Sequence, residues 1–180
     1  AVYAIDVDGD MDVDVLSASE SSGRTFDVAW YENDGAASFE RKEILGFDRG
    51  RRAVVALDVD GDGDVDVLDA SYNAGTVSWY ENQATDEWGR TAGGQVTFEA
   101  HAITTSATGA RAVEARDLDG DGDVDVLAAS ALDDTVAWYE NLGRAGYSPS
   151  VDFVQHLVSS SRSDFARGAP PPSPRPTSTT

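Results

Sequence analysis

The sequence contains no cysteine, few basic side chains and no apolar run long enough to cross a membrane. Without cysteine there are no disulfides and no thiolate chemistry, so another stabilising device is needed. A membrane-spanning helix needs about 20 largely apolar residues in succession, so we expect no membrane insertion. Only 13 Lys and Arg stand against 33 Asp and Glu, which gives a formal charge of −20. Nucleic acid and anionic membrane surfaces would repel such a chain, and we expect neither as a partner.

Apolar and aromatic residues are nevertheless abundant. Hydrophobic side chains make up 41% of the 180 residues and include 4 Trp, 6 Tyr and 6 Phe. This content supplies enough apolar surface for a core, so we expect a folded chain despite its acidity. The length suits one ordinary domain or an array of smaller units that share a continuous core.

Three aligned copies of one pattern divide the chain. They begin at Ala1, Ala53 and Ala112 with AVYAIDVDGDMDVDVL, AVVALDVDGDGDVDVL and AVEARDLDGDGDVDVL. Each continues with a Trp-Tyr-Glu-Asn landmark and then a segment that opens with Phe, at 30–33 and Phe39, 79–82 and Phe98, and 138–141 and Phe153. We predict repeats at 1–52, 53–111 and 112–168, followed by a tail rich in Pro, Ser and Thr at 169–180.

Each copy has the residue pattern of β-strands. Val, Ile, Leu, Trp and Tyr alternate with polar residues, and no helical period appears. In the second copy we predict strands at 53–57, 65–71, 76–81 and 96–103, with a tight turn at 73–75. Four such strands form an antiparallel meander, and radial repetition covers both faces of the sheet, as in β-propeller blades. The predicted fold is all-β, with three tandem four-stranded blades.

Three blades do not close a ring, because closed propellers have at least about four. We therefore expect a segment of a longer protein, a piece that oligomerises, or an open array that stacks end to end. The sequence leaves these alternatives open.

An aspartate-rich loop follows the first predicted strand of every copy, as in DVDGDGDVD of the second. Such a cluster repels itself, whereas Ca²⁺ takes about six to eight oxygen ligands and a turn with glycines can wrap around it. By analogy with other loops of this type, we expect side-chain oxygens from positions 1, 3, 5 and 9, a backbone carbonyl from position 7, and about one Ca²⁺ per repeat, up to three in all. The predicted ligands are Asp6, Asp8, Asp10, Asp12 and Asp14, then Asp58, Asp60, Asp62, Asp64 and Asp66, and finally Asp117, Asp119, Asp121, Asp123 and Asp125.

An EF-hand, a magnesium site and a plain acidic turn each fit these loops less well than a calcium site does. An EF-hand needs Glu at position 12 and flanking helices, but position 12 is Ser17, Asp69 or Ala128 and the flanks are strands. Magnesium keeps more water in its tight octahedron, and solvated acidic turns rarely repeat three times with one spacing. In the first loop Met11 stands where the others have glycine, and a left-handed backbone there would cost roughly 1 kcal/mol.

The aspartate loop, the Trp-Tyr-Glu-Asn landmark and the strand that opens with Phe together resemble the FG-GAP/VCBS repeat family. Calcium-loop blades of this family also build the propeller head of integrin α subunits. The resemblance covers residues 1 to about 168 and implies an extracellular or cell-surface protein used in adhesion, in matrix or as a non-catalytic module. The chain departs from the family in its blade number, in Met11, and in lacking a clear Phe-Gly and Gly-Ala-Pro motif.

Several further side chains could have a chemical role, but the repeat accounts for them better. His101 and His156 both stand three residues after the landmark Phe, so we expect equivalent structural positions and no catalysis. The landmark Trp residues are expected to pack between blades, although exposed ones would suit stacking on sugars. Their Glu and Asn neighbours are expected to bind backbone or turn groups. Paired glycosidase carboxylates would not recur in every repeat, so we predict that the chain is not an enzyme.

The sequence thus predicts a calcium-binding, extracellular structural or adhesion protein. Its repeats would contact one another or copies of the same chain, and head-to-tail contacts would build a filament. Alternatively, the chain is a module that binds carbohydrate or a protein through loops on one propeller face, with the long loop 83–95 as its site. The tail suits O-linked glycans, as in a glycoprotein, or an unmodified linker.

Overall fold

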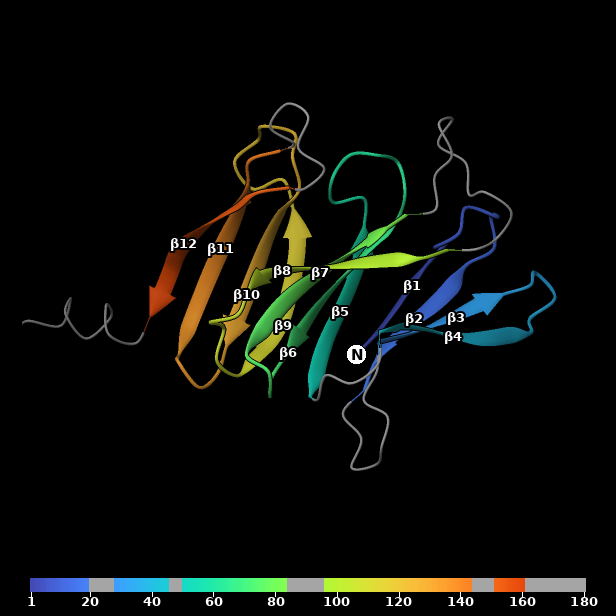
Figure 1. Ribbon diagram of the computed structural model, residues 1–180, viewed down its shortest axis with the longest axis horizontal. Helices are drawn as coiled ribbons and strands as arrows, with labels where there is room; N and C mark the ends of the chain where they lie inside the picture. Colours follow the sequence, from blue (N-terminus) through green and yellow to red (C-terminus); the bar gives the residue numbers. More distant parts are fainter. Residues whose placement is uncertain (20–27, 46–49, 84–95, 144–150, 161–180) are drawn as a thin grey trace, which may run out of the picture.

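The computed structural model describes residues 1–19, 28–45, 50–83, 96–143 and 151–160, which form twelve β-strands and no helix (Figure 1). They build three four-stranded antiparallel sheets in the orders β1-β2-β3-β4, β5-β6-β7-β8 and β9-β10-β11-β12, so the predicted all-β fold is confirmed. In this described part of the chain no helix is long and apolar enough to cross a membrane. The strands are β1 (Val2–Ile5), β2 (Asp14–Ala18), β3 (Val28–Asn33), β4 (Phe39–Leu45), β5 (Arg51–Leu57), β6 (Asp66–Ser71), β7 (Thr76–Asn82), β8 (Phe98–Thr104), β9 (Ala110–Arg116), β10 (Asp125–Ser130), β11 (Thr135–Asn141) and β12 (Phe153–Ser160).

The second sheet follows the predicted meander with small differences. Strand β7 begins at Thr76 as predicted, whereas β5 begins earlier, at Arg51, because a bulge before Ala53 lets the pairing continue to Ser71. The predicted turn is present: Gly75 has a left-handed φ of 69°, and its N–H donates to the carbonyl of Ser71 at 2.9 Å. The limits of the repeats along the chain stay a prediction.

The three sheets stand side by side in chain order (Figure 1). Strand β5 packs against β1 of one neighbouring sheet and against β9 of the other. One apolar core contains Trp30 of the first sheet and Tyr80 of the second, and another contains Trp79 of the second and Tyr139 of the third. Each of these two Trp residues therefore packs toward the following sheet, which confirms the expected packing between blades for Trp30 and Trp79. Burial of a large apolar side chain stabilises a fold by about 1.5–3 kcal/mol.

The outermost sheets lack the cover that the inner contacts provide. Trp138 is half-buried and Val136 is 37% exposed, whereas their counterparts in the second sheet, Trp79 and Val77, are 1% and 0% exposed. At the other end Tyr31 is half-buried, although the equivalent tyrosines of the later sheets are buried. The three described sheets therefore form an open array.

A buried charged group lies inside the second sheet. Arg51 and Asp69 are almost inaccessible to solvent and form an ion pair, and the Tyr80 hydroxyl donates to Asp69 Oδ1 at 3.0 Å. Burial raises the pKa of Asp69, while burial and the Asp69 carboxylate raise the pKa of Tyr80 to about 12. Removing one partner of such a buried pair costs about 3–5 kcal/mol, so this group ties β5, β6 and β7 together.

Candidate metal centres

The aspartate loops connect the first and second strands of each sheet: β1 to β2, β5 to β6, and β9 to β10. In Figure 1 the β5–β6 and β9–β10 loops lie at the same end of neighbouring sheets. We number each loop from its first aspartate, so that position 1 is Asp6, Asp58 or Asp117.

Each loop is held by hydrogen bonds from its own backbone to its own carboxylates. In the second loop Asp58 accepts from the N–H groups of Gly61 at 2.7 Å and Gly63 at 3.0 Å. Position 3 accepts from the N–H of position 5 at 3.1 Å, and position 5 accepts from that of position 7 at 2.9 Å. The first and third loops repeat these bonds at distances between 2.7 and 3.3 Å. The three loops therefore share one pattern of backbone-to-carboxylate hydrogen bonds, which we call the loop plan.

The loop plan brings carboxylate oxygens of the same loop close to one another. In the first two loops one oxygen each from positions 1, 3 and 5 lies within 4.8 Å of the others, and in the third loop positions 1, 3 and 9 form the group. Hard oxygen donors at this spacing suit Ca²⁺, which binds oxygen at about 2.3–2.6 Å. The residues present therefore fit the ion, and the assignment of individual ligand atoms stays a prediction. The groups are Asp6, Asp8 and Asp10, then Asp58, Asp60 and Asp62, and finally Asp117, Asp119 and Asp125.

Position 7 contributes no carboxylate to these groups among the described residues. In the first and third loops its side chain lies against the glycine that follows the landmark by two residues: a Cβ added to Gly143 would lie 2.6 Å from Asp123 Oδ2, and one added to Gly35 would clash with Asp12. This placement is compatible with the prediction that position 7 offers its backbone carbonyl to the ion.

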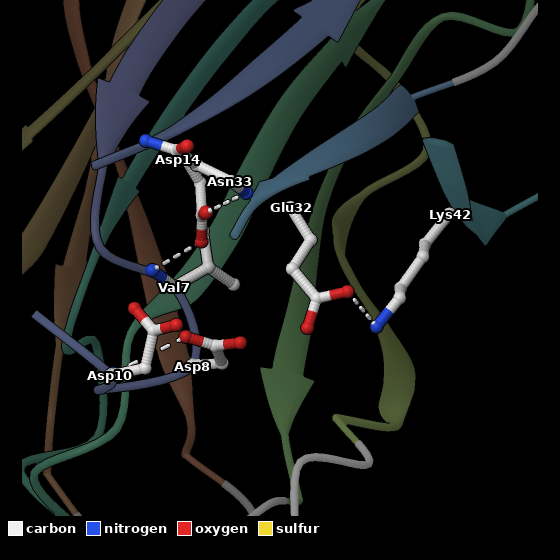
Figure 2. A network of polar contacts seen from close by, with 7 residues as sticks. All are labelled: Val7, Asp8, Asp10, Asp14, Glu32, Asn33 and Lys42. Atoms are coloured by element: carbon white, nitrogen blue, oxygen red, sulfur yellow. Dashed lines mark hydrogen bonds and ion pairs between the residues drawn. The ribbon is translucent and has the colours of Figure 1, made fainter. Parts of the chain in front are cut away.

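Position 9 has a structural role that sequence reasoning missed. Asp66 is fully buried, its Oδ2 accepts from the N–H of Val59 at 2.9 Å, and its Oδ1 accepts from the N–H of Asn82 at 2.8 Å. Figure 2 shows the equivalent bonds of Asp14 in the first loop, and Asp125 repeats them in the third. A carboxylate has about four lone-pair sites, so two N–H bonds leave position 9 able to bind an ion as well.

The landmark asparagine connects neighbouring repeats. Asn82 Nδ2 donates to the carbonyl of Val65 in its own loop at 3.1 Å and to that of Val7 in the preceding loop at 3.3 Å. Asn141 also bonds its own loop and reaches Val59 of the preceding one at 3.1 Å. The expectation that this asparagine binds backbone groups is confirmed. The first and second loops are thereby each tied to the following repeat.

Crowding and burial perturb the loop carboxylates. Burial, and then the charge of Asp10, raise the pKa of Asp8 to about 6, and burial raises the pKa of Asp66 to about 7. Figure 2 shows Asp8 and Asp10 close to each other in the first loop. The ionised form of these carboxyl groups is thus disfavoured by their surroundings, and a bound divalent cation would favour it.

Met11 occupies position 6 of the first loop with a left-handed φ of 78°, where Gly63 and Gly122 have φ values of 98° and 101°. The backbone at Met11 is therefore left-handed, the case for which a cost in strain was expected from the sequence. The Met11 N–H still donates to Asp6 Oδ2, at 2.9 Å. The first loop therefore has the same loop plan as the others, and the left-handed backbone at Met11 costs roughly 1 kcal/mol in strain.

A second repeated group lies on the third and fourth strands of each sheet. His101 stacks on Trp79 with ring centroids 4.7 Å apart, and its Nε2 lies 2.9 Å from Glu81 Oε2. His156 has the same surroundings in the third sheet, and Lys42 takes this place in the first. The two histidines therefore hold equivalent positions in different sheets, as predicted. The landmark glutamate pairs with a side chain of the next strand, a partner that its sequence context did not indicate.

Two predicted features fall on residues that the structure does not describe. The first is the proposed ligand-binding loop 83–95, of which only Gln83 lies within the described residues. The second is the tail at 169–180, which lies wholly outside them. Both remain predictions.

The FG-GAP-like repeat matches the chain twice, over residues 6–68 and 58–128. Each match begins at position 1 of one aspartate loop and ends in the second strand of the next repeat, β6 or β10. No curated protein matches the chain. The two matches together span residues 6–128, which is more than half of the 180 residues. With its three four-stranded sheets and their shared loop geometry, the chain belongs to the FG-GAP-like repeat family.

Proposed function

We propose that the chain is a calcium-binding structural repeat protein in which Ca²⁺ stabilises each aspartate loop and the joint between repeats. The observation that carries this proposal is the asparagine bridge: Asn82 and Asn141 each tie their own loop to the preceding one. An ion that orders one loop therefore also stabilises the contact of two repeats. In a chain without cysteine, this device takes the place of disulfides.

Within each loop we assign side-chain ligands to positions 1, 3, 5 and 9 and a backbone carbonyl to position 7. All are oxygen donors, which favours Ca²⁺ over softer metals. The bound ion would neutralise carboxylates that otherwise repel one another, and the formal charge of −20 largely reflects these loops. We expect about one ion per repeat and up to three per chain.

The setting that we propose is a cell surface or an extracellular assembly, with a structural or adhesive task. FG-GAP-like repeats are typical of extracellular proteins and of non-enzymatic modules, which supports this setting.

The open ends of the array support head-to-tail contact between copies of the chain. At the last sheet Trp138 is half-buried and Leu118, in the third loop, is 39% exposed, whereas Val59 at the same loop position is 2% exposed. At the first sheet Tyr31 is half-buried, while Tyr80 is buried in a core between sheets. A copy whose first sheet packed on the third sheet of another would cover both ends, and such a heterologous contact continues into a filament.

Thermal unfolding of the whole chain with calcium and with a chelator, together with metal stoichiometry by elemental analysis, tests the calcium proposal. We expect about three ions per chain and a large fall in Tm on chelation, because an ion at 100 times its Kd stabilises a site by about 2.7 kcal/mol. Two ions would mean that the Met11 loop does not bind. Absence of bound metal, with the same Tm in both buffers, would refute the proposal.

A pair of matched variants locates the ions. Asp60→Asn removes a carboxylate of the second loop and should lower the stoichiometry by one ion. Asp152→Asn removes one exposed carboxylate outside the loops and should leave the stoichiometry unchanged. Equal stoichiometry in the two variants would show that the aspartate loops are not the binding sites.

A further inference from the structure

The second sheet carries a group of potential metal ligands that lies outside its aspartate loop. Glu81 of β7 pairs directly with Glu99 of β8, and Trp79 pairs with His101 in the same ladder. Because side chains two residues apart on a strand share a face, all four lie on one face of the hairpin. One ligand atom each from Glu81, Glu99 and His101 lies within 4.8 Å of the others.

The imidazole of this group is held in place before any ligand arrives. His101 stacks on Trp79 with the ring planes 30° apart, and Trp79 is 1% exposed. His101 Nε2 also lies 2.9 Å from Glu81 Oε2, so the hydrogen bond already points one ligand atom at another. The side chains of His101 and Glu81 are 25% and 10% exposed, and Glu99 is exposed. The group is therefore ordered at its base and open to solvent at its rim.

The ligand chemistry selects a class of ion. Imidazole nitrogen is a ligand for Zn²⁺ and related transition metals, whereas Ca²⁺ prefers oxygen donors alone. Zinc binds His nitrogen and carboxylate oxygen at about 2.0–2.2 Å and often takes three protein ligands with water in the fourth position. We propose that Glu81, Glu99 and His101 bind a Zn²⁺-class ion, at a site independent of the calcium loops. Binding would require the exposed Glu99 side chain to move toward the other two ligands, and a change of rotamer can provide this movement.

The other two repeats provide internal controls at the same position. In the third sheet His156 stacks on Trp138 and contacts Glu140 at 2.5 Å, but Val154 takes the place of Glu99. In the first sheet Lys42 replaces the histidine beside Glu32, and a protonated amine is no metal ligand. Only the second repeat has all three ligands, so we expect one zinc site per chain.

The test uses the whole chain saturated with calcium, so that the aspartate loops are occupied, and titrates it with zinc chloride. Competition with a chromogenic zinc chelator gives affinity and stoichiometry, and NMR of the imidazole nitrogens follows the only two histidines, His101 and His156. We expect one zinc per chain, with the His101 resonances shifting at zinc concentrations at least 10-fold below any change at His156.

Two exchanged substitutions separate the site from general binding to an acidic surface. Glu99→Val copies the third repeat and should weaken zinc binding at least 10-fold. Val154→Glu copies the second repeat and should raise the stoichiometry from one to two, with new shifts at His156. Both positions are exposed, and an unchanged Tm in calcium verifies that the variants fold.

The proposal is overturned if Glu99→Val binds zinc as tightly as the unmodified chain, or if both histidines respond together in the unmodified chain. It is equally overturned if further calcium displaces the zinc, since the ion would then occupy the aspartate loops. These outcomes leave the calcium stoichiometry untouched, so failure of the zinc site and failure of the proposed calcium function are distinguishable.

Discussion

At the scale of single residues, the aspartates of one loop have different tasks. Positions 1, 3 and 5 accept hydrogen bonds within the loop, as Asp58 does from Gly61, and in the first two loops one oxygen from each of them lies close to the others. Position 9, represented by Asp66, is buried and accepts hydrogen bonds from the backbone N–H groups of Val59 and Asn82, which lie 7 and 16 residues away in the sequence. A substitution at position 9 should therefore affect the fold with or without metal, whereas one at position 3 should act through the metal.

Asp66→Asn should lower the free energy of unfolding by about 1–3 kcal/mol even in chelator, because an amide NH₂ facing a buried N–H leaves both donors unsatisfied. Asp60→Asn should cost less than about 0.5 kcal/mol in chelator, since the bond that its carboxylate accepts from Asp62 lies within the loop and its charge adds repulsion there. Urea denaturation in chelator measures both values. Equal losses would contradict the structural role of position 9.

Met11→Gly should stabilise the protein by roughly 1 kcal/mol, because glycine adopts a φ of 78° without the strain of a Cβ. The Met11 side chain is 91% exposed, so little packing is lost. Gly63→Ala is the matched control and should destabilise by a similar amount, since a Cβ there meets no atom within 4 Å and only the backbone is strained. Urea denaturation with and without calcium provides the comparison, and a Met11→Gly variant less stable than the parent would disprove the strain.

At the scale of the elements, the end of each third strand is where loop and neighbouring repeat meet. The backbone N–H of Asn82 bonds Asp66 of its own loop, and its side chain bonds the carbonyls of two loops. Through these three hydrogen bonds, Asn82 links the conformation of its own loop to the packing of its sheet against the preceding one. In the first repeat, Asn33 Nδ2 bonds only Val13 of its own loop among the described residues.

Asn141→Ala should therefore be more destabilising than Asn33→Ala. The first variant leaves the buried carbonyl of Val59 without this donor and should cost about 1–3 kcal/mol, whereas the Asn33 amide is exposed and its loss should cost less than about 1 kcal/mol. Chemical denaturation in calcium measures the difference. Calcium binding to the second loop should also weaken in Asn141→Ala, and identical behaviour of the two variants would argue against coupling between repeats.

At the scale of the whole molecule, the array is a set of sheets whose ends resemble its interior. Val136 and Trp138 lie on one face of β11, and the equivalent Val77 and Trp79 face the core between the second and third sheets. The third sheet thus leaves partly exposed the apolar face that, in the second sheet, is covered by the following repeat. Association of copies through this surface would extend the same packing.

Val136→Lys should abolish self-association in millimolar calcium, because a charged side chain would be buried against the next copy. Leu157→Lys is the control: Leu157 is 56% exposed and pairs with Ala137, which faces the second sheet, so association should persist. Light scattering as a function of protein concentration distinguishes the variants. A monomeric, monodisperse parent chain at millimolar calcium would refute the filament.

Local pattern was enough to predict the repeats, the strands and the loops. Alternating side chains define β-strands, and the strands of the second repeat lie close to their predicted limits. The turn formed by positions 1 to 7 depends on contacts between residues no more than five positions apart, such as Asp58 with Gly63. For this reason the left-handed backbone at Met11 was also predictable from its sequence position.

Tertiary structure alone decided how the repeats are joined. The bonds from Asn82 to Val7 and from Asn141 to Val59 span 75 and 82 residues, and only the packing of neighbouring sheets brings these groups together. The ion pair of Arg51 with Asp69 likewise depends on the register of β5 and β6, which brings these two buried side chains together. By itself the sequence determined the units and their acidic loops, because those depend on short-range geometry. The open array and the buried position 9 depend on long-range packing, which has no local signal in the chain.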